Sequence, residues 1–331
     1  MSRSRDPDAL QRILETDTGA RHPGGTPALL IVGLCLAWSL FQLWHASPLP
    51  FLLDVGVFNS TEARAIHLGF GMVLAYLAWP MRRRAGGGRI PGHDWLLAAA
   101  AGFAATYVFW FHDALAQRPG LPMERDILVA VAGLVLLLEA ARRTLGLPLV
   151  AVALVFLGYV FFGDAPILPE VLRWKGASLD RAMSHQWLTT EGVYGIALGV
   201  STSFVFLFVL FGALLEQAGA GGWFIRVAFA LLGALRGGPA KAAVVASGLT
   251  GVISGSSIAN VVTTGTFTVP LMRRTGFSRE RAGAIEVASS VNGQLMPPVM
   301  GAAAFLMVEY VGIAYVDVIR HALLPAVIAY A

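Results

Sequence analysis

The sequence predicts an all-α polytopic membrane protein, and three observations lead to that class. Hydrophobic residues make up 56% of the chain and charged residues only 13%, a charged share well below that of soluble domains. Several apolar runs approach the ~20 residues that a helix needs to cross a bilayer. The formal net charge is +4, and the basic residues cluster at the edges of these runs. That distribution is a topology signal and argues against a nucleic-acid surface, so the expected surroundings are a lipid bilayer.

The N-terminal half contains five expected spans, preceded by a polar tail at residues 1–26 in which a short helix over Pro7–Glu15 can form. Basic residues follow the second and fourth spans, whereas the loop at 46–63 has none. Because positive loops stay in the cytoplasm, the N-terminus is expected there. Cys35 is the lone cysteine, which excludes a disulfide framework and a cysteine metal cluster. We place the spans at 27–45, 64–80, 94–111, 126–141 and 147–162.

Residues 164–194 interrupt the pattern of spans, because they are polar, mixed in charge and contain Trp174, Trp187 and Tyr194. We place this connector in the periplasm, partly as a helix lying at the interface. Two interpretations stay open: an aromatic-anchored connector, or a docking surface for a periplasmic partner. A sixth span is expected at 195–217. The run at 222–236 is short and basic near both ends, which favours an interfacial arm helix on the cytoplasmic side.

Two apolar arms at 242–253 and 258–272 flank a small polar interruption. Each arm holds about 12–15 residues, or about 18–22 Å of helix, which is too short for a hydrocarbon core of about 30 Å. Lys241 precedes the first arm, and Arg273 and Arg274 follow the second, so both ends are expected in the cytoplasm. The pattern therefore predicts a re-entrant helical hairpin with its tip inside the membrane. Non-helical backbone at that depth survives only when it is buried in protein or lines a wet cavity.

A second apolar stretch is interrupted in a similar way. We expect half-helices at 279–291 and 299–311, separated by Asn292-Gly293-Gln294 and Pro297-Pro298. Proline lacks the backbone donor and clashes with the preceding turn, so the helix breaks there. Two interrupted helices side by side place free carbonyls and helix N-termini near the membrane centre. Secondary transporters build cation and anion sites in this way.

The hairpin and the broken helix resemble the large membrane subunit of tripartite ATP-independent periplasmic (TRAP) transporters. The resemblance is carried by GVISGSSIANVVTTGTFTVPLMRRTGFSRERAGAIEVASSVNGQLMPPVMGAAAF, residues 251–305. It is greatest to the TAXI branch, in which the small and large membrane subunits are fused. It implies an elevator-type permease of the bacterial inner membrane. Such a permease imports small organic anions, is usually driven by Na⁺, and receives its substrate from a periplasmic solute-binding protein.

The same resemblance suggests a division of the chain. Residues 27–163 correspond to the small-subunit spans plus a connecting span, and residues 164–194 to a periplasmic connector. Residues 195–331 correspond to the first half of the large-subunit transport module. The family has two inverted repeats, each with a hairpin and a broken helix, and this sequence holds only the first. We therefore expect an N-terminal portion of a longer protein, or one part of a split one.

The two interruptions supply the candidate site residues. Small polar residues in membrane helices often serve close packing, but here they form the turn of a hairpin too short to span. Neither interruption contains a carboxylate, so a Na⁺ ion would be held by neutral oxygens, with H⁺ as the other possible coupling ion. We expect substrate contacts from Ser256, Ser257, Asn260, Gln294 and Pro297. We expect Na⁺ contacts from Ser254, Gly255, Asn260, Asn292 and Gly293.

Other polar residues receive structural interpretations. Glu286 is expected to snorkel or to pair with Arg281 at the cytoplasmic edge, with a coupling role as the alternative. Thr263 and Thr264 are expected to bond back to carbonyls of their own helix. His67 is expected to be packed or hydrogen-bonded inside the protein.

Two other function classes stay open, an intramembrane serine hydrolase and a channel or structural subunit. A hydrolase would use Ser256 or Ser257, but the G-x-S-x-G elbow is absent. The nearest histidines, His185 and His321, lie outside the predicted core, so a base is missing. A channel would need a continuous polar lining, which a closed re-entrant tip does not supply. The sequence therefore favours a carrier over an enzyme.

Overall fold

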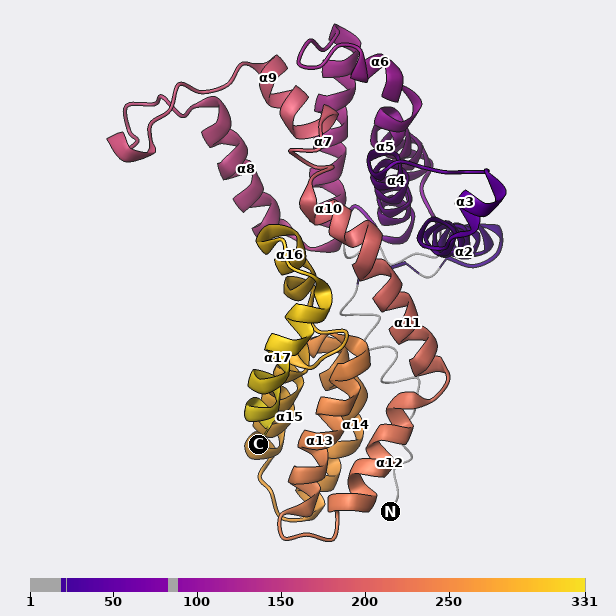
Figure 1. Cartoon of the computed structure of the whole chain (residues 1–331), viewed down its shortest axis with the longest axis vertical. Helices are drawn as coiled ribbons and strands as arrows, with labels where there is room; N and C mark the ends of the chain where they lie inside the picture. The colour runs from indigo at the N-terminus through magenta and orange to yellow at the C-terminus, as the bar shows by residue number, and fades with distance from the viewer. Residues whose placement is uncertain (1–18, 22, 83–88, 331) are drawn as a thin grey trace. The chain divides into compact units, whose positions relative to one another are not determined.

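The computed structural model describes residues 19–21, 23–82 and 89–330, so the short helix expected over Pro7–Glu15 lies outside the described residues. Within those ranges the chain forms helices and no strands, which confirms the all-α class. The chain divides into two compact units, residues 1–199 and 200–331 (Figure 1). In the described part of the chain, two helices are long and apolar enough to cross a membrane, Thr26–Ala46 and Ile196–Gln217.

Five helices of the first unit correspond to the five expected spans. The core between them is rich in alanine, which lets helix backbones approach closely. Glycines bring the second and third of these helices still nearer to each other. A Cβ on Gly69 would lie 2.8 Å from the Thr106 side chain, and a Cβ on Gly102 would lie 2.8 Å from the Val73 side chain. The five helices are α2 (Thr26–Ala46), α4 (Ser60–Ala78), α5 (Gly92–Trp110), α7 (Glu124–Thr144) and α8 (Leu147–Phe161).

The connector after α8 is folded into the first unit more deeply than the sequence indicates. It contains the short α9 (Leu179–Met183) and a π-helical turn at Ser184–Leu188. Trp187 and Tyr194 are fully buried, and they donate hydrogen bonds to the carbonyls of Ala104 (3.1 Å) and Ala105 (2.8 Å) on α5. Two of the three aromatic residues expected at the interface are thus core residues. An anchoring role is wrong for these two side chains, because aromatic residues suit a core and an interface equally well.

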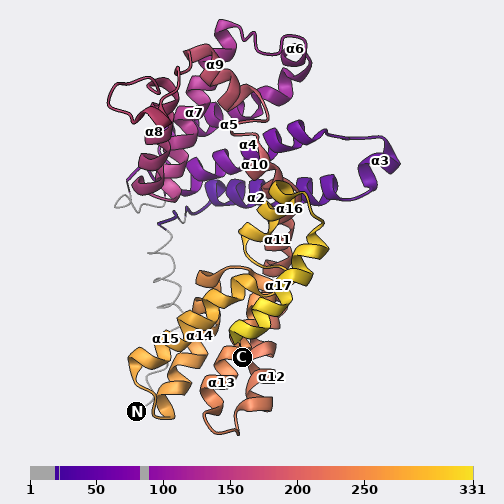
Figure 2. The same cartoon turned by 60° about the vertical axis from the view of Figure 1, so that its left-hand side comes forward.

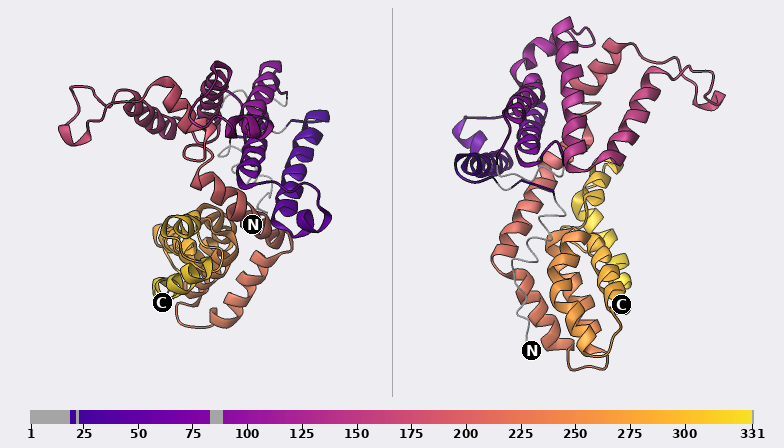
Figure 3. Two further views of the ribbon diagram at one scale, coloured as in Figure 1. Left: turned by 45° about the horizontal axis from the view of Figure 1, so that its top comes forward. Right: turned by 180° about the vertical axis from the view of Figure 1, so that it is seen from behind.

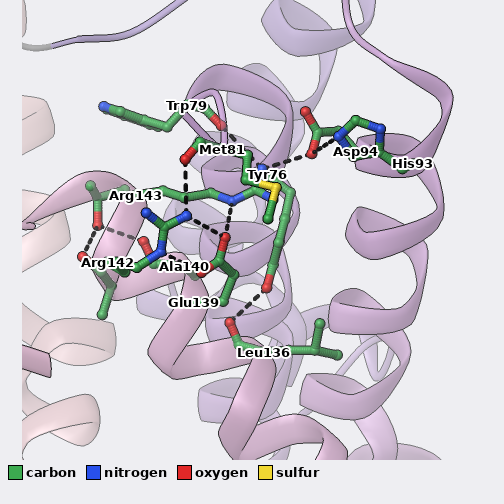
Figure 4. Close-up of polar contacts among 12 residues, drawn as sticks. Tyr76, Trp79, Met81, His93, Asp94, Leu136, Glu139, Ala140, Arg142 and Arg143 are labelled. Carbon is green, nitrogen blue, oxygen red and sulfur yellow. Dashed lines mark hydrogen bonds and ion pairs between the residues drawn. The ribbon is translucent and has the colours of Figure 1, made fainter. Parts of the chain in front are cut away.

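A buried ion-pair network ties the ends of α4, α5 and α7 together (Figure 4). Asp94 accepts a hydrogen bond from Arg143 over 2.8 Å and a second one from Arg21. Arg143 also donates to Glu139 over 2.9 Å, and its guanidinium lies 4.6 Å from the centre of the Tyr76 ring. Arg21 belongs to the expected cytoplasmic tail, so this part of the tail packs against the unit instead of extending away from it. His67 is buried as expected, and accepts a hydrogen bond from Trp38 over 3.1 Å.

The second unit contains the interrupted helices. Figure 2 shows α13, α14 and α15 side by side, and Figure 3 shows the same orange bundle from behind. The sixth expected span is helical from Ile196 to Gln217 with a π-helical turn at Ser201–Val205. The elements that follow are α12 (Ala220–Leu232), α13 (Gly238–Ser254), α14 (Ser257–Arg274), α15 (Arg279–Asn292), the 3₁₀ turn η4 (Gly293–Leu295), α16 (Ala302–Val311) and α17 (Tyr315–Tyr330).

The hairpin is present, but its arms are longer than predicted. α13 has 17 residues and α14 has 18, which corresponds to about 25–27 Å of helix. The prediction stopped each arm at its charged end, whereas the helices continue through Lys241 and through Arg273 and Arg274. Gly237 in the left-handed region precedes α13, with Pro239 in its first turn, which is a favourable start for a helix.

Candidate functional site

The tip of the hairpin and the break in the following helix lie in contact. Gln294 donates a hydrogen bond through Nε2 to the Ser257 hydroxyl over 2.9 Å. Gly293 lies against Asn260, because a Cβ added to Gly293 would be 2.9 Å from the Asn260 amide nitrogen. The structure therefore brings together four residues that come from the two interruptions. Three of these four, Ser257, Asn260 and Gln294, are expected substrate ligands.

Asn260 is the best-defined polar group of this contact. It is fully buried on α14, and its amide nitrogen donates to the carbonyl (2.9 Å) and the hydroxyl (3.0 Å) of Ser247 on α13. These bonds hold the two arms of the hairpin together and fix the orientation of the amide. The Asn260 Oδ1 atom is buried and has no hydrogen-bond partner among the described residues. Such an orphaned amide oxygen is free to accept a ligand, either a cation or a donor group.

Asn292 lies at the end of α15 and is directed elsewhere. Its amide nitrogen donates to the carbonyl of Ala329 on α17 over 3.0 Å. The next residue, Gly293, begins the 3₁₀ turn and its carbonyl accepts from the Met296 amide over 3.2 Å. The two asparagines expected to share a Na⁺ therefore have different partners. Asn260 is bonded to Ser247 of α13, and Asn292 is bonded to Ala329 of α17.

The turn of the hairpin packs against the segment after the break. Ser254 is the last residue of α13, and Gly255 follows with φ 56° in the left-handed region. A Cβ on Gly255 would lie 2.2 Å from the carbonyl oxygen of Met300, so only glycine fits this turn. Ser256 is exposed and Pro297 is half-buried. The segment after the helix break thus packs over the tip of the hairpin.

An apolar cavity of about 290 Å³ lies beside the tip, within the second unit. Its walls come from α11 (Phe206–Gln217) and from both arms of the hairpin. Val209 and Ile253 supply apolar surface, and the polar groups are Glu216, Thr250, Ser256 and Thr263. Ser256 is the one residue that this cavity shares with the expected substrate ligands.

The sequence interpretation missed a row of buried polar residues below the tip. Glu286 was expected at the cytoplasmic edge near Arg281, but its exposed fraction is only 1%, whereas Arg281 is exposed. The Glu286 carboxylate instead contacts the hydroxyls of Thr264 and Thr268 on α14. Thr264 does bond back to the Asn260 carbonyl over 2.8 Å as expected, but it also binds Glu286. The row continues with Ser247, Thr250, Ser289 and Ser290.

A signal for this row exists in the sequence. Thr264 and Thr268 are four residues apart, as are Glu286 and Ser290, so each pair lies on one face of its helix. Gly265 faces the same carboxylate, and a Cβ there would lie 3.1 Å from Glu286 Cγ. Polar residues at this spacing on two neighbouring helices indicate faces that pack on one another.

No group of three or more His, Cys, Asp or Glu side chains within residues 19–21, 23–82 and 89–330 could hold a metal ion. A cation at the tip would therefore use amide, hydroxyl and carbonyl oxygens, and Asn260 Oδ1 fits that donor set.

Comparison with known proteins connects this geometry to one family. The model of the family described as "Tripartite ATP-independent periplasmic transporter, DctM component" matches residues 132–331, which is more than half of the chain. The match begins within α7 and includes the hairpin, the break and α17. No solved structure matches the chain.

Three curated proteins share a 91-residue segment with it. One is the uncharacterized protein YgiK of Salmonella typhimurium, at 36% identity. The others are described as C4-dicarboxylate TRAP transporter large permease proteins, at 36% identity in Vibrio cholerae and 35% in Rhodobacter capsulatus. The segment is 28% of this chain and 20–21% of these relatives, so the chain matches about a fifth of their length.

Proposed function

This chain belongs to the DctM component family of tripartite ATP-independent periplasmic transporters, and from that membership we propose that it is a permease that imports small dicarboxylates across the bacterial inner membrane. The substrate class comes from the names of two relatives, which are C4-dicarboxylate permeases. Because the family consists of transporters, membership supports neither a serine hydrolase nor a channel.

The contact between the hairpin tip and the helix break is the observation that supports this proposal most directly. Both elements interrupt their helices with small polar residues, and the Gln294–Ser257 hydrogen bond joins them. A carboxylate substrate needs donors, and the hydroxyls of Ser256 and Ser257 with the Gln294 amide offer them. The Asn260 amide lies beside this contact on the side that faces the inside of the bundle.

Coupling to Na⁺ is part of the proposal. Na⁺ is a hard cation that prefers oxygen ligands, by the logic that governs Ca²⁺. Asn260 Oδ1 is buried without a partner among the described residues, and we assign it as one ligand. Ser254, Gly255, Asn292 and Gly293 remain the other expected contributors. A cation held by neutral oxygens would favour an anionic substrate beside it, so binding of each would raise the affinity for the other.

We further propose that the permease works by an elevator mechanism and receives its substrate from a periplasmic solute-binding protein, with its N-terminus in the cytoplasm. In the fused arrangement, residues 27–163 supply the small-subunit spans plus a connecting span, and residues 195–331 begin the transport module. The burial of Trp187 and Tyr194 removes them from any docking surface, which leaves the exposed part of residues 164–194 as the candidate contact.

The test is uptake of radiolabelled succinate by proteoliposomes that contain the complete protein, with and without its solute-binding protein. We expect uptake to require the binding protein and to rise with external Na⁺. Asn260→Ala should weaken the Na⁺ dependence more than Asn292→Ala does, because the Asn260 oxygen is buried at the tip while the Asn292 amide is bonded to α17. Unchanged Na⁺ dependence in both variants would exclude this Na⁺ site. Uptake at full rate without any binding protein would exclude the tripartite arrangement.

A further inference from the structure

Glu286 is a carboxyl group inside the second unit whose partners are all neutral. It lies on α15 with an exposed fraction of 1%. One carboxylate oxygen contacts the Thr264 hydroxyl and the other contacts the Thr268 hydroxyl, both from α14. The Ser290 hydroxyl, one turn along α15, lies 3.3 Å from Oε1. No ion pair in the described part of the chain includes Glu286.

The cationic groups on the packed helices lie at exposed helix ends. α13, α14 and α15 all pack together, and their charged residues other than Glu286 occupy the end of the bundle away from the break. All of these side chains are exposed, whereas Glu286 is buried two turns into α15. They are Lys241 on α13, Arg273 and Arg274 on α14, and Arg279, Glu280 and Arg281 on α15.

The remaining neighbours of α15 add no cation near Glu286. The turn η4 has no titratable residue. α17 contacts α15 through its C-terminal end, where Tyr330 donates to the Ser289 carbonyl over 2.6 Å. Its charged residues, Asp317, Arg320 and His321, lie in its first two turns, at the opposite end of the helix. Among the described residues, the Glu286 carboxylate is therefore contacted by hydroxyl groups and by no cation.

These hydroxyls can satisfy Glu286 with or without a proton. Thr264 lies 2.8 Å from the carbonyl of Asn260, and Thr268 lies 3.0 Å from the carbonyl of Thr264. Each threonine thus has a second acceptor within its own helix. When Glu286 is ionised, both hydroxyls can donate to the carboxylate. When it is protonated, the carboxyl can donate to one threonine, which then turns its own proton to the helix carbonyl.

The same network reaches the hairpin tip. Ser290 lies 3.1 Å from the Ser247 hydroxyl, which accepts from the Asn260 amide over 3.0 Å. With Glu286 ionised, every donor can point the same way, from Asn260 to Ser247, to Ser290 and to the carboxylate. With Glu286 protonated, the Ser290 hydroxyl loses its charged acceptor and can donate to the Ser247 hydroxyl, while the Asn260 amide nitrogen remains a donor to Ser247. The state of Glu286 therefore bears on Asn260, the residue assigned to the cation site.

We propose that Glu286 reversibly binds a proton between α14 and α15, and that this proton is coupled through Ser290 and Ser247 to the site at Asn260. A proton fits better than Na⁺ because the threonine oxygens contact the carboxylate directly, whereas a metal ion would need to stand between its ligands. The proton-binding part is independent of transport. The coupling part rests on the proposed function.

The direct test is infrared difference spectroscopy of the complete protein titrated between about pH 5 and about pH 9, a range that includes the ordinary and buried behaviour of carboxyl groups. We expect a carboxylic acid C=O band that appears reversibly on acidification and is absent in Glu286→Gln. Glu309→Gln removes an exposed acid and should leave that band in place. Thr268→Val keeps the carboxyl but removes one hydroxyl, and should move the pH midpoint of the band.

The outcomes separate the two proposals. A spectrum with no Glu286-dependent change across the range would overturn the proton site, whatever the transport data show. If Glu286→Gln does not fold, an unmoved band in Thr268→Val would overturn it as well. In proteoliposomes, the Na⁺ concentration for half-maximal uptake should change about tenfold with pH in the wild type and stay constant in Glu286→Gln. If the infrared band titrates but the protein transports no dicarboxylate, the proton site is supported and the transport proposal is rejected.

Discussion

Gly251 of α13 and Gly293 of η4 pack backbone to backbone: a Cβ added to Gly251 would lie 2.6 Å from the Cα atom of Gly293. The neighbour is main chain, so it cannot rotate away as a side chain would. This contact seats the break in the second interrupted helix against the first arm of the hairpin. It also positions Gly293 beside Asn260, and so helps to form the candidate site.

Replacing Gly251 by alanine should push η4 away from α13. We expect a loss of about 1–3 kcal/mol in the free energy of unfolding, as for other overpacked positions, and a lower melting temperature in detergent. Gly283→Ala is the matched control, because nothing lies within 4 Å of its Cβ position on α15. There the better helix propensity should stabilise by up to about 1 kcal/mol. Equal melting temperatures for the two variants would contradict the close contact.

Replacing Asp94 by asparagine should destabilise the first unit strongly. The change removes the charge of a buried carboxylate that lies 2.8 Å from the fully buried Arg143 side chain and also pairs with Arg21, which leaves Glu139 as the remaining carboxylate beside Arg143. Breaking a buried pair on one side costs about 3–5 kcal/mol. The control is Asp317→Asn. Asp317 pairs with Arg320 over 3.2 Å, and both side chains are exposed, so loss of this ion pair should cost at most about 1 kcal/mol. Thermal melting of both variants in the same detergent measures the difference. Similar losses would mean that the network at Asp94 is solvated.

Replacing Trp187 by alanine should empty a space in the core of the first unit. We expect a loss of about 3–5 kcal/mol, typical of a buried aromatic residue, together with the loss of the hydrogen bond to Ala104. Trp110 has an exposed fraction of 66%, and Trp110→Ala should change stability by only about 0.5 kcal/mol. A Trp187→Ala protein with native stability that fails only to bind its periplasmic partner would restore the docking interpretation of this residue.

Cysteine accessibility tests the topology of the hairpin. In a Cys35→Ser background, Ala240→Cys and Thr275→Cys place single thiols at the two open ends of α13 and α14. Positive residues flank both positions, so both ends are expected in the cytoplasm. Neither thiol should react with a membrane-impermeant reagent added outside intact cells, and both should react after permeabilisation. Labelling of one position alone from outside would show that the segment crosses the membrane once.

The sequence alone determined the class and the location of the elements. Apolar runs and the charges between them identify α2, α4, α5, α7 and α8 to within a few residues, because the length of a helix and its polarity are local properties. The same reasoning located the hairpin and the break, since glycine and proline act on the backbone at their own positions. It underestimated the arms because a basic residue can end a membrane span without ending the helix.

Only the tertiary structure decided which side chains meet. Glu286 lies five residues from Arg281, a spacing at which helix residues do not face each other, and its partners Thr264 and Thr268 come from a different helix. Trp187 and Tyr194 look like interface anchors until α5 supplies carbonyls for their polar atoms. Asn260 and Asn292 have the same side chain and the same expected role, yet one binds α13 and the other α17. Periodicity shows that a residue has a buried face, but the partner of that face depends on how distant helices pack.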